Sequence, residues 1–191
     1  MKYEILDDGT NVILREPAPE DQQSSFDFFL NLPDEDRRYL RIDVTRPGVV
    51  ERRLVQAQSG EVYRLWAFVG DEIAADGALE FSGEQWGGHL GEIRVIVGRE
   101  YQRRGLGTLL MRELFHVAEE RGLEKIVMNM LEPQTSMRAA CEKLGFRVDA
   151  VVPNHVKDQD GKTQSLVIMT CTLDQWFREM KDFYEENNWD G

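Results

Sequence analysis

The succession of expected strands and helices predicts an α+β fold built on one mixed sheet. In the middle of the chain, short β-branched runs alternate with glycine turns, which is typical of antiparallel strands. In the second half, amphipathic helices separate the strands, which is typical of crossover connections. The 191 residues can form a core that needs no disulfide or metal. We therefore expect one domain over residues 1–173, followed by an amphipathic C-terminal helix within residues 174–191.

The first half of the chain contributes a strand, helices and then an antiparallel meander. The apolar stripe of the first helix stops at Pro33, because proline cannot continue a helix. Glycine-containing turns then separate the strands. The expected elements are the strand Asn11–Arg15, the helices Glu20–Leu32, Asp34–Ile42 and Val49–Gln58, and the strands Arg64–Val69, Ile73–Phe81 and Glu92–Val97.

The second half alternates helices with strands. Leu106, Leu110 and Leu114 fall on one helical face, and Gly122 supplies the C-terminal stop. The expected elements are this helix, the strand Lys125–Leu131, a short helix from Thr135 or Ser136 to Gly145, the strands Phe146–Val152 and Ser165–Leu173, and the helix Asp174–Glu186. One face of the last helix either packs on the core or joins two copies in a homodimer. That face carries Trp176, Phe177, Met180 and Phe183.

The composition is acidic. There are 23 Lys and Arg against 35 Asp and Glu, so the net charge is −12 and the isoelectric point is about 4.8. Proteins that bind nucleic acid through its phosphates usually present a basic face, so we expect no nucleic-acid partner. An acidic surface attracts cations, including protonated amines.

Nothing in the sequence indicates export or a membrane partner. The first ten residues lack the apolar core of a signal peptide, and no apolar run approaches the roughly 18 residues of a membrane helix. The two cysteines are Cys141 and Cys171. We expect a cytoplasmic protein with free thiols.

The segment Val95–Thr108 (VIVGREYQRRGLGT) predicts an anion-binding loop. A strand ends, three arginines follow, and a helix begins at Gly105-Leu106-Gly107. The first N–H groups of a helix have no partner within it and favour a negative charge. The P-loop pattern G-x-x-x-x-G-K-[ST] is absent, and a dinucleotide fingerprint would need a third glycine where Leu110 stands. The alternative is a helix start without a ligand, where glycines allow close packing and arginines aid solubility.

Two short motifs make the chain resemble a known family. Gln102–Gly107 (QRRGLG) matches the Q/R-x-x-G-x-G/A loop with which GNAT acetyltransferases hold acyl-CoA, and Glu142–Phe146 (EKLGF) matches that family's E-K-x-G-F ending. The resemblance covers about Asn11–Leu173. It implies the GNAT fold, a splayed mixed sheet of about seven strands with flanking helices. It also implies acetyl-CoA as the acyl donor and an amine or protein-lysine acceptor. Separately, no Cys/His cluster has metal-ligand spacing, so we expect no metal.

The same resemblance places coenzyme A between the strands Glu92–Val97 and Lys125–Leu131. It assigns the pantetheine arm to the backbone of the first strand and the pyrophosphate to the N–H groups at the following helix start. Gln134 stands where many relatives have an Asn that contacts the arm, and its greater length leaves that contact open. The expected cofactor-binding residues are Val95, Ile96, Val97, Gln102, Arg103, Arg104, Gly105, Leu106, Gly107, Thr108 and Gln134.

Glu92 is the candidate general base. A lysine-like amine with a pKa near 10.4 is only about one part in a thousand neutral at pH 7.4, a cost of about 4 kcal/mol. Glu92 begins the strand expected to hold the thioester, although period 2 also makes it a solvated salt-bridge partner of Arg94. GNAT modules of bacterial protein-lysine acetyltransferases, which Leu32–Arg41 also resembles, carry a catalytic Glu at the matching position.

Five further polar residues have a place in this scheme. Glu80 could hold a substrate ammonium, and His155 could touch the substrate. His89 is either a proton relay or an exposed loop residue, and His116 belongs to helix packing. Asn129 lies across the splay and cannot act as a base.

Cys141 stands where many relatives have a Tyr that protonates the departing CoA thiolate. Three interpretations stay open: a small buried hydrophobe, a proton donor in place of the Tyr, or a nucleophile that carries the acetyl group. No neighbour on its helical stripe is placed to activate it as a nucleophile.

The sequence therefore favours an N-acetyltransferase that moves an acetyl group from acetyl-CoA to a primary amine, on a protein lysine or a small molecule. The transfer is expected to proceed by direct attack with general-base help. One alternative is an N-terminal or ribosomal-protein acetyltransferase. The other is a regulatory module that binds acyl-CoA without efficient turnover.

Overall fold

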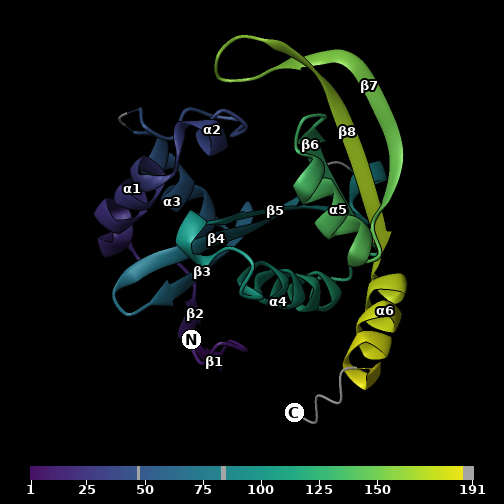
Figure 1. The fold of residues 1–191 in the computed structure, drawn as a ribbon, viewed down its shortest axis with the longest axis horizontal. Coiled ribbons are helices and arrows are strands. Elements are labelled where there is room, and N and C mark those ends of the chain that lie inside the picture. Colours follow the sequence, from purple (N-terminus) through teal and green to yellow (C-terminus); the bar gives the residue numbers. More distant parts are fainter. Residues whose placement is uncertain (47, 83–84, 187–191) are drawn as a thin grey trace.

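The computed structural model describes residues 1–46, 48–82 and 85–186, with side chains described as far as residue 180. An eight-stranded sheet in the order β1-β2-β3-β4-β5-β6-β8-β7 runs through the described part of the chain (Figure 1). Neighbouring strands are antiparallel except β5 and β6, which pair in parallel. The strands are β1 (Lys2–Ile5), β2 (Asn11–Arg15), β3 (Val62–Val69), β4 (Glu72–Phe81), β5 (Leu90–Val97), β6 (Lys125–Leu131), β7 (Arg147–Lys157) and β8 (Thr163–Thr172). The predicted α+β class with a mixed sheet is confirmed.

The strand beyond the seven expected is β1. Its residues pair with β2 across a turn in which the Leu6 N–H donates to the Thr10 carbonyl. Asp8-Gly9 provides the sequence signal for that hairpin, with Gly9 at a φ of +83°.

Six α-helices flank the sheet in the described residues. They are α1 (Gln22–Asn31), α2 (Asp34–Arg37), α3 (Val49–Ser59), α4 (Leu106–Glu120), α5 (Thr135–Lys143) and α6 (Leu173–Glu186). In Figure 1, α1, α2 and α3 lie over one face of the sheet and α4 lies over the other. Two hydrophobic clusters result, one beneath α1 and α3 around Trp66 and Phe68, and a larger one around α4, α5 and α6.

The expected helix Asp34–Ile42 is wrong beyond Arg37, where α2 ends. After Arg37 the chain takes an irregular path, and the turn between β7 and β8 holds it there. There the Gln159 N–H donates to the Arg38 carbonyl at 3.1 Å, and the Gln159 side chain donates to the Leu40 carbonyl at 2.7 Å. In Figure 1 the β7–β8 hairpin arches over toward α2. A long-range tether of this kind leaves no local trace in the sequence.

The C-terminal helix packs on the core. The Trp176 ring stacks on Phe115 with centroids 4.0 Å apart, and Met180 is buried in the same cluster. Phe115 also meets Phe146 of the E-K-x-G-F motif edge-on at 5.9 Å. The Phe183 side chain and residues 187–191 lie outside the described part, and the boundary at residue 173 stays a prediction. No helix of the described chain is long and apolar enough to cross a membrane.

Candidate active site

β5 and β6 diverge after three paired positions and open a cavity between them. Their parallel pairing runs from Leu90 opposite Lys125 to Glu92 opposite Val127. A cavity of about 1030 Å³ occupies the opening and extends under the segment that follows α2. This volume is at the upper end of the range typical of small-molecule and cofactor sites. The splay that the resemblance implied is present.

The edges of the two diverging strands present backbone groups to the cavity. The Gln102 side chain donates to the Val97 carbonyl at 3.1 Å, and the Leu131 N–H donates to Gln134 Oε1 at 2.8 Å. Because backbone groups alternate in direction along a strand, the N–H and C=O of Val95 face the same way as those of Val97. Those of Ile96 face β4. The edge thus offers pairing groups to an amide-bearing ligand at every second residue.

The loop before α4 forms a concave surface of N–H groups. Arg103 and Gly105 both adopt the left-handed conformation, with φ of +60° and +84°. Gly105 is also the N-cap residue just before α4, and the first helical bond runs from the Leu109 N–H to the Gly105 carbonyl. The N–H groups before Leu109 therefore have no helical partner, which makes this end of the cavity a place for an anion.

Most residues expected to hold the cofactor line this cavity, although Arg104 and Leu106 do not. The Arg104 side chain lies 3.5 Å from Asp8 and packs over the Tyr101 ring, and the Leu106 side chain is buried in the core. Those that line it are Val95, Ile96, Val97, Gln102, Arg103, Gly105, Gly107, Thr108 and Gln134.

Glu92 sits at the last paired position, where the two strands begin to separate. Its carboxylate forms an ion pair with Arg41, and its side chain is 22% exposed. Glu92 is not among the described residues that line the cavity, whereas Arg94, two residues further along, is.

The other polar candidates fall into two groups. Asn129 and His155 line the cavity, whereas Glu80 forms an ion pair with Arg94 on the neighbouring strand. His89 and His116 are exposed, and the His116 ring packs 5.3 Å from Phe177. Among the described residues, no group of three or more His, Cys, Asp and Glu is placed to hold a metal.

Cys141 is buried beside the cavity. Its Sγ lies 3.5 Å from the Met128 Sδ, and burial raises the pKa of the thiol to about 12. Burial also raises the pKa of Cys171 to about 11, and both thiols are free. A neutral buried thiol fits the small-hydrophobe interpretation and opposes the nucleophile interpretation, because the thiolate is the attacking form.

Sequence reasoning missed an arginine cluster at the end of the cavity away from α4. Arg64 donates to the buried Asp76 at 2.7 Å, and Arg53 pairs with the same carboxylate. Burial lowers the pKa of Arg53 to about 10, and that of Arg94 falls to about 10 for the same reason. The sequence signal for this cluster was the presence of charged residues, Arg64 and Asp76, inside the apolar strands β3 and β4.

The splayed sheet beside an anion-binding helix start defines the GNAT fold, which solved structures share. One is a putative acetyltransferase from Salmonella typhimurium with its cofactor acetyl-CoA. It has a TM-score of 0.71 and 21% identity, over 86% of this chain and 95% of that one.

Residues 23–146 match the Acetyltransferase (GNAT) family, so the chain belongs to that family. A mycothiol acetyltransferase from Corynebacterium glutamicum is 33% identical over 106 residues, 53% of this chain and 35% of the relative. The ribosomal protein bS18-alanine N-acetyltransferase of Escherichia coli K12 is 27% identical over 74 residues, 39% of this chain and 50% of the relative. The chain thus spans between a third and a half of these curated relatives. The predicted family is confirmed.

Proposed function

We propose that this protein is an acetyl-CoA-dependent N-acetyltransferase that acetylates a primary amine. The observation that carries the proposal is the opening between β5 and β6, with the α4 helix start at one end of the cavity and polar side chains at the other. Pantetheine amides would pair with the edge of β5, and the pyrophosphate would meet the N–H groups before Leu109. Gln102, Arg103, Gly107 and Thr108 complete this donor site.

The reaction is a direct transfer. The amine nitrogen attacks the thioester carbon, a C–N bond forms, and the C–S bond breaks as the CoA thiolate leaves. Backbone N–H groups at the β5 edge would stabilise the oxyanion, and Glu92 takes the proton that the ammonium must lose. Cys141 stays a packing residue, because its raised pKa and its contact with Met128 hold it neutral in the core. The departing thiolate is protonated by solvent.

Two other functions are compatible with membership of the family. Acetylation of a protein N-terminus is favoured by the similarity to an alanine N-acetyltransferase. A regulatory module that binds acyl-CoA would use the same donor site without needing Glu92. We expect the enzyme to act in the cytoplasm, and a homodimer stays a prediction that light scattering tests.

Calorimetry with acetyl-CoA and a thiol-release assay against a panel of amines test the proposal. We expect micromolar affinity for acetyl-CoA and amine-dependent release of CoA. Binding without release for any amine favours the regulatory module. Absence of binding overturns the proposal.

A further inference from the structure

The end of the cavity away from α4 is lined by arginines, although the chain carries a net charge of −12. We propose that this end binds the acceptor, and that the acceptor is a small amine with an anionic group next to its nitrogen. The α-amino acids are the simplest members of that class. The inference rests on the acetyltransferase function proposed above and names its substrate class.

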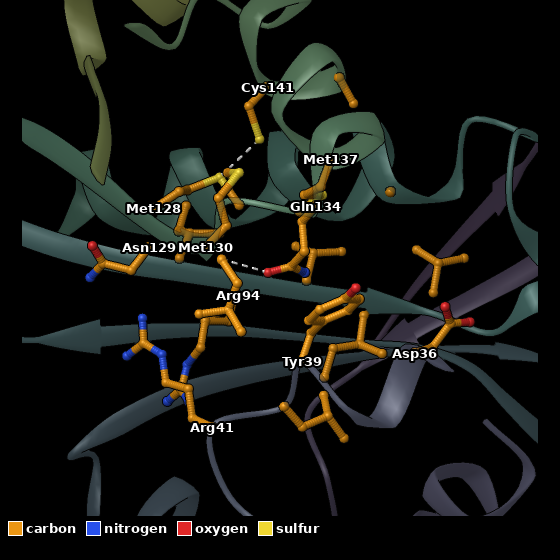
Figure 2. A pocket seen from close by; sticks show the side chains of 18 of the residues that line it. Asp36, Tyr39, Arg41, Arg94, Met128, Asn129, Met130, Gln134, Met137 and Cys141 are labelled. Atoms are coloured by element: carbon orange, nitrogen blue, oxygen red, sulfur yellow. Dashed lines mark hydrogen bonds between the residues drawn. The ribbon is translucent and has the colours of Figure 1, made fainter. Parts of the chain in front are cut away.

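Arg94 and Asn129 are the first residues beyond the paired positions whose side chains lie on the same face of the sheet as Glu92. Glu92 and Val127 are partners at the last paired level, and Arg94 and Asn129 each follow by two residues, so all four side chains lie on one face of the sheet. Figure 2 shows Arg94, Asn129 and Arg41 at the same end of the cavity. Arg94 and Asn129 both line the cavity, so the cavity extends to this level.

Two buried polar atoms at this level have complementary needs. The Arg94 Nε and the Asn129 Oδ1 have no hydrogen-bond partner among the described residues. Buried polar atoms are normally paired, because leaving them without a partner costs free energy. The guanidinium N–H can donate a hydrogen bond to an anionic oxygen, and the amide oxygen can accept one from an N–H. An α-amino acid carries both groups on one carbon atom.

The local charge also favours an anion. Four guanidinium groups form ion pairs with three carboxylates in one cluster, which leaves one positive charge in excess within that cluster. The guanidinium groups belong to Arg41, Arg53, Arg64 and Arg94, and the carboxylates to Asp76, Glu80 and Glu92. Burial and the other guanidinium groups lower the pKa of Arg94, so an acceptor carboxylate would stabilise its charge and a polyamine would be repelled.

The roof over this part of the cavity favours a small acceptor over a protein. Residues of the β7–β8 hairpin line one wall, and Arg38–Ile42 and Val44 line the other. The Gln159 backbone and side chain bridge these walls at 3.1 and 2.7 Å, and Arg38 pairs with Asp160 at 2.9 Å. A lysine on a folded protein would have to break these contacts to reach the cavity.

Matched acceptors test the inference. Thiol release is measured with several α-amino acids, with the amide of each, with cadaverine and with a lysine-containing peptide. We expect kcat/KM at least tenfold higher for the acids than for any of the other three classes. The comparison between acid and amide is demanding. Converting the carboxylate to an amide lowers the basicity of the amine, so a larger fraction of it is unprotonated, and without recognition by the protein the amides would react faster.

Three variants show whether the arginines supply the preference. Arg94→Gln and Arg41→Gln should each lower the ratio of acid to amide kcat/KM by about tenfold. Arg52→Gln, on α3 but outside the cavity lining, removes the same charge and should change that ratio less than twofold. Taking the ratio of acid to amide cancels general effects on folding or on Glu92. Arg41 lies on an irregular segment, so replacing it leaves the sheet intact.

The outcomes separate the two proposals. The inference is overturned if the amino acids react no faster than their amides, or do not react at all. In that case the proposed function still stands, provided that the protein binds acetyl-CoA and acetylates some other amine. An acid preference that survives both arginine variants also overturns it. Loss of acetyl-CoA binding by the wild-type protein overturns the proposed function itself.

Discussion

The proposed donor side of the cavity is made mainly by one continuous stretch, Val95–Thr108, whereas the proposed acceptor side collects Arg41, Arg64, Arg94 and Asn129 from four separate segments. The donor side presents mainly backbone N–H and C=O groups, whose directions follow from strand alternation and from the start of α4. The acceptor side presents side chains whose positions depend on the sheet order and on the hairpin that covers them. Local geometry therefore defines the donor side, and tertiary packing defines the acceptor side.

Gly105→Asp should break the donor side alone and have the largest effect. The new carboxylate would lie at the α4 start, where it competes with phosphate for the same N–H groups, so we expect CoA binding to be abolished. The fold should survive, because a Cβ at Gly105 meets no described atom within 4 Å and Asp tolerates a positive φ.

Gly122→Asp is the matched control for this variant. Gly122 has a φ of +70° and equally open space, but it follows the other end of α4. Calorimetry should show CoA binding within twofold of the wild-type protein for this variant. If both glycine variants lose binding equally, the anion site at the α4 start is wrong.

Asp76→Asn should damage the acceptor side through stability. Burial alone would raise the pKa of Asp76, but Arg64 and Arg53 outweigh it and hold that pKa below its usual range. Removing the charge leaves two buried guanidinium groups without their partner, and the free energy of unfolding should fall by about 3 kcal/mol. Chemical denaturation measures it, with the exposed Glu72→Gln on the same strand as control.

The same pair of variants gives a pH signature. Because the pKa of Asp76 is lowered, its stabilisation is present above the ordinary carboxyl range near pH 4 and is lost as the pH falls below it. The acid-induced loss of stability should therefore be smaller in Asp76→Asn than in the wild-type protein. Parallel curves for the two proteins would show that this ion pair does not stabilise the fold.

The contrast between the two sides explains what the sequence could predict. Gly105 and the E-K-x-G-F motif belong to short continuous patterns, so the family and the opening between β5 and β6 could be predicted from the sequence. The arginine cluster could not follow, because only the sheet register brings Arg64 next to Asp76 and Arg94 next to Glu80.

Glu92→Gln tests the point where the two sides meet. The variant keeps the shape and removes the base, so the rate should fall about 100-fold near pH 7.5 and recover partly at high pH, where the amine is already neutral. Acetyl-CoA affinity should stay within twofold, which calorimetry measures. The exposed Glu124→Gln serves as the charge control. An unchanged rate would make Glu92 only the ion-pair partner of Arg41.

Cys141→Ala should have the smallest effect, because this residue belongs to neither side. Burial raises the pKa of its thiol to about 12, so the neutral form prevails at assay pH and turnover should change less than threefold. A small packing loss beside Met128 should cost about 1 kcal/mol of stability. The raised pKa also means that the wild-type protein loses stability as the pH rises above the ordinary thiol range, and Cys141→Ala should lose less.

Cys171→Ala is the control, because the Cys171 thiol is also buried but does not line the cavity. A tenfold fall in turnover with the fold intact, seen for Cys141→Ala but not for Cys171→Ala, would return Cys141 to the chemistry as the proton donor or the acetyl carrier. An acetylated Cys141 detected by mass spectrometry without acceptor, with the label then passing into product, would identify the carrier.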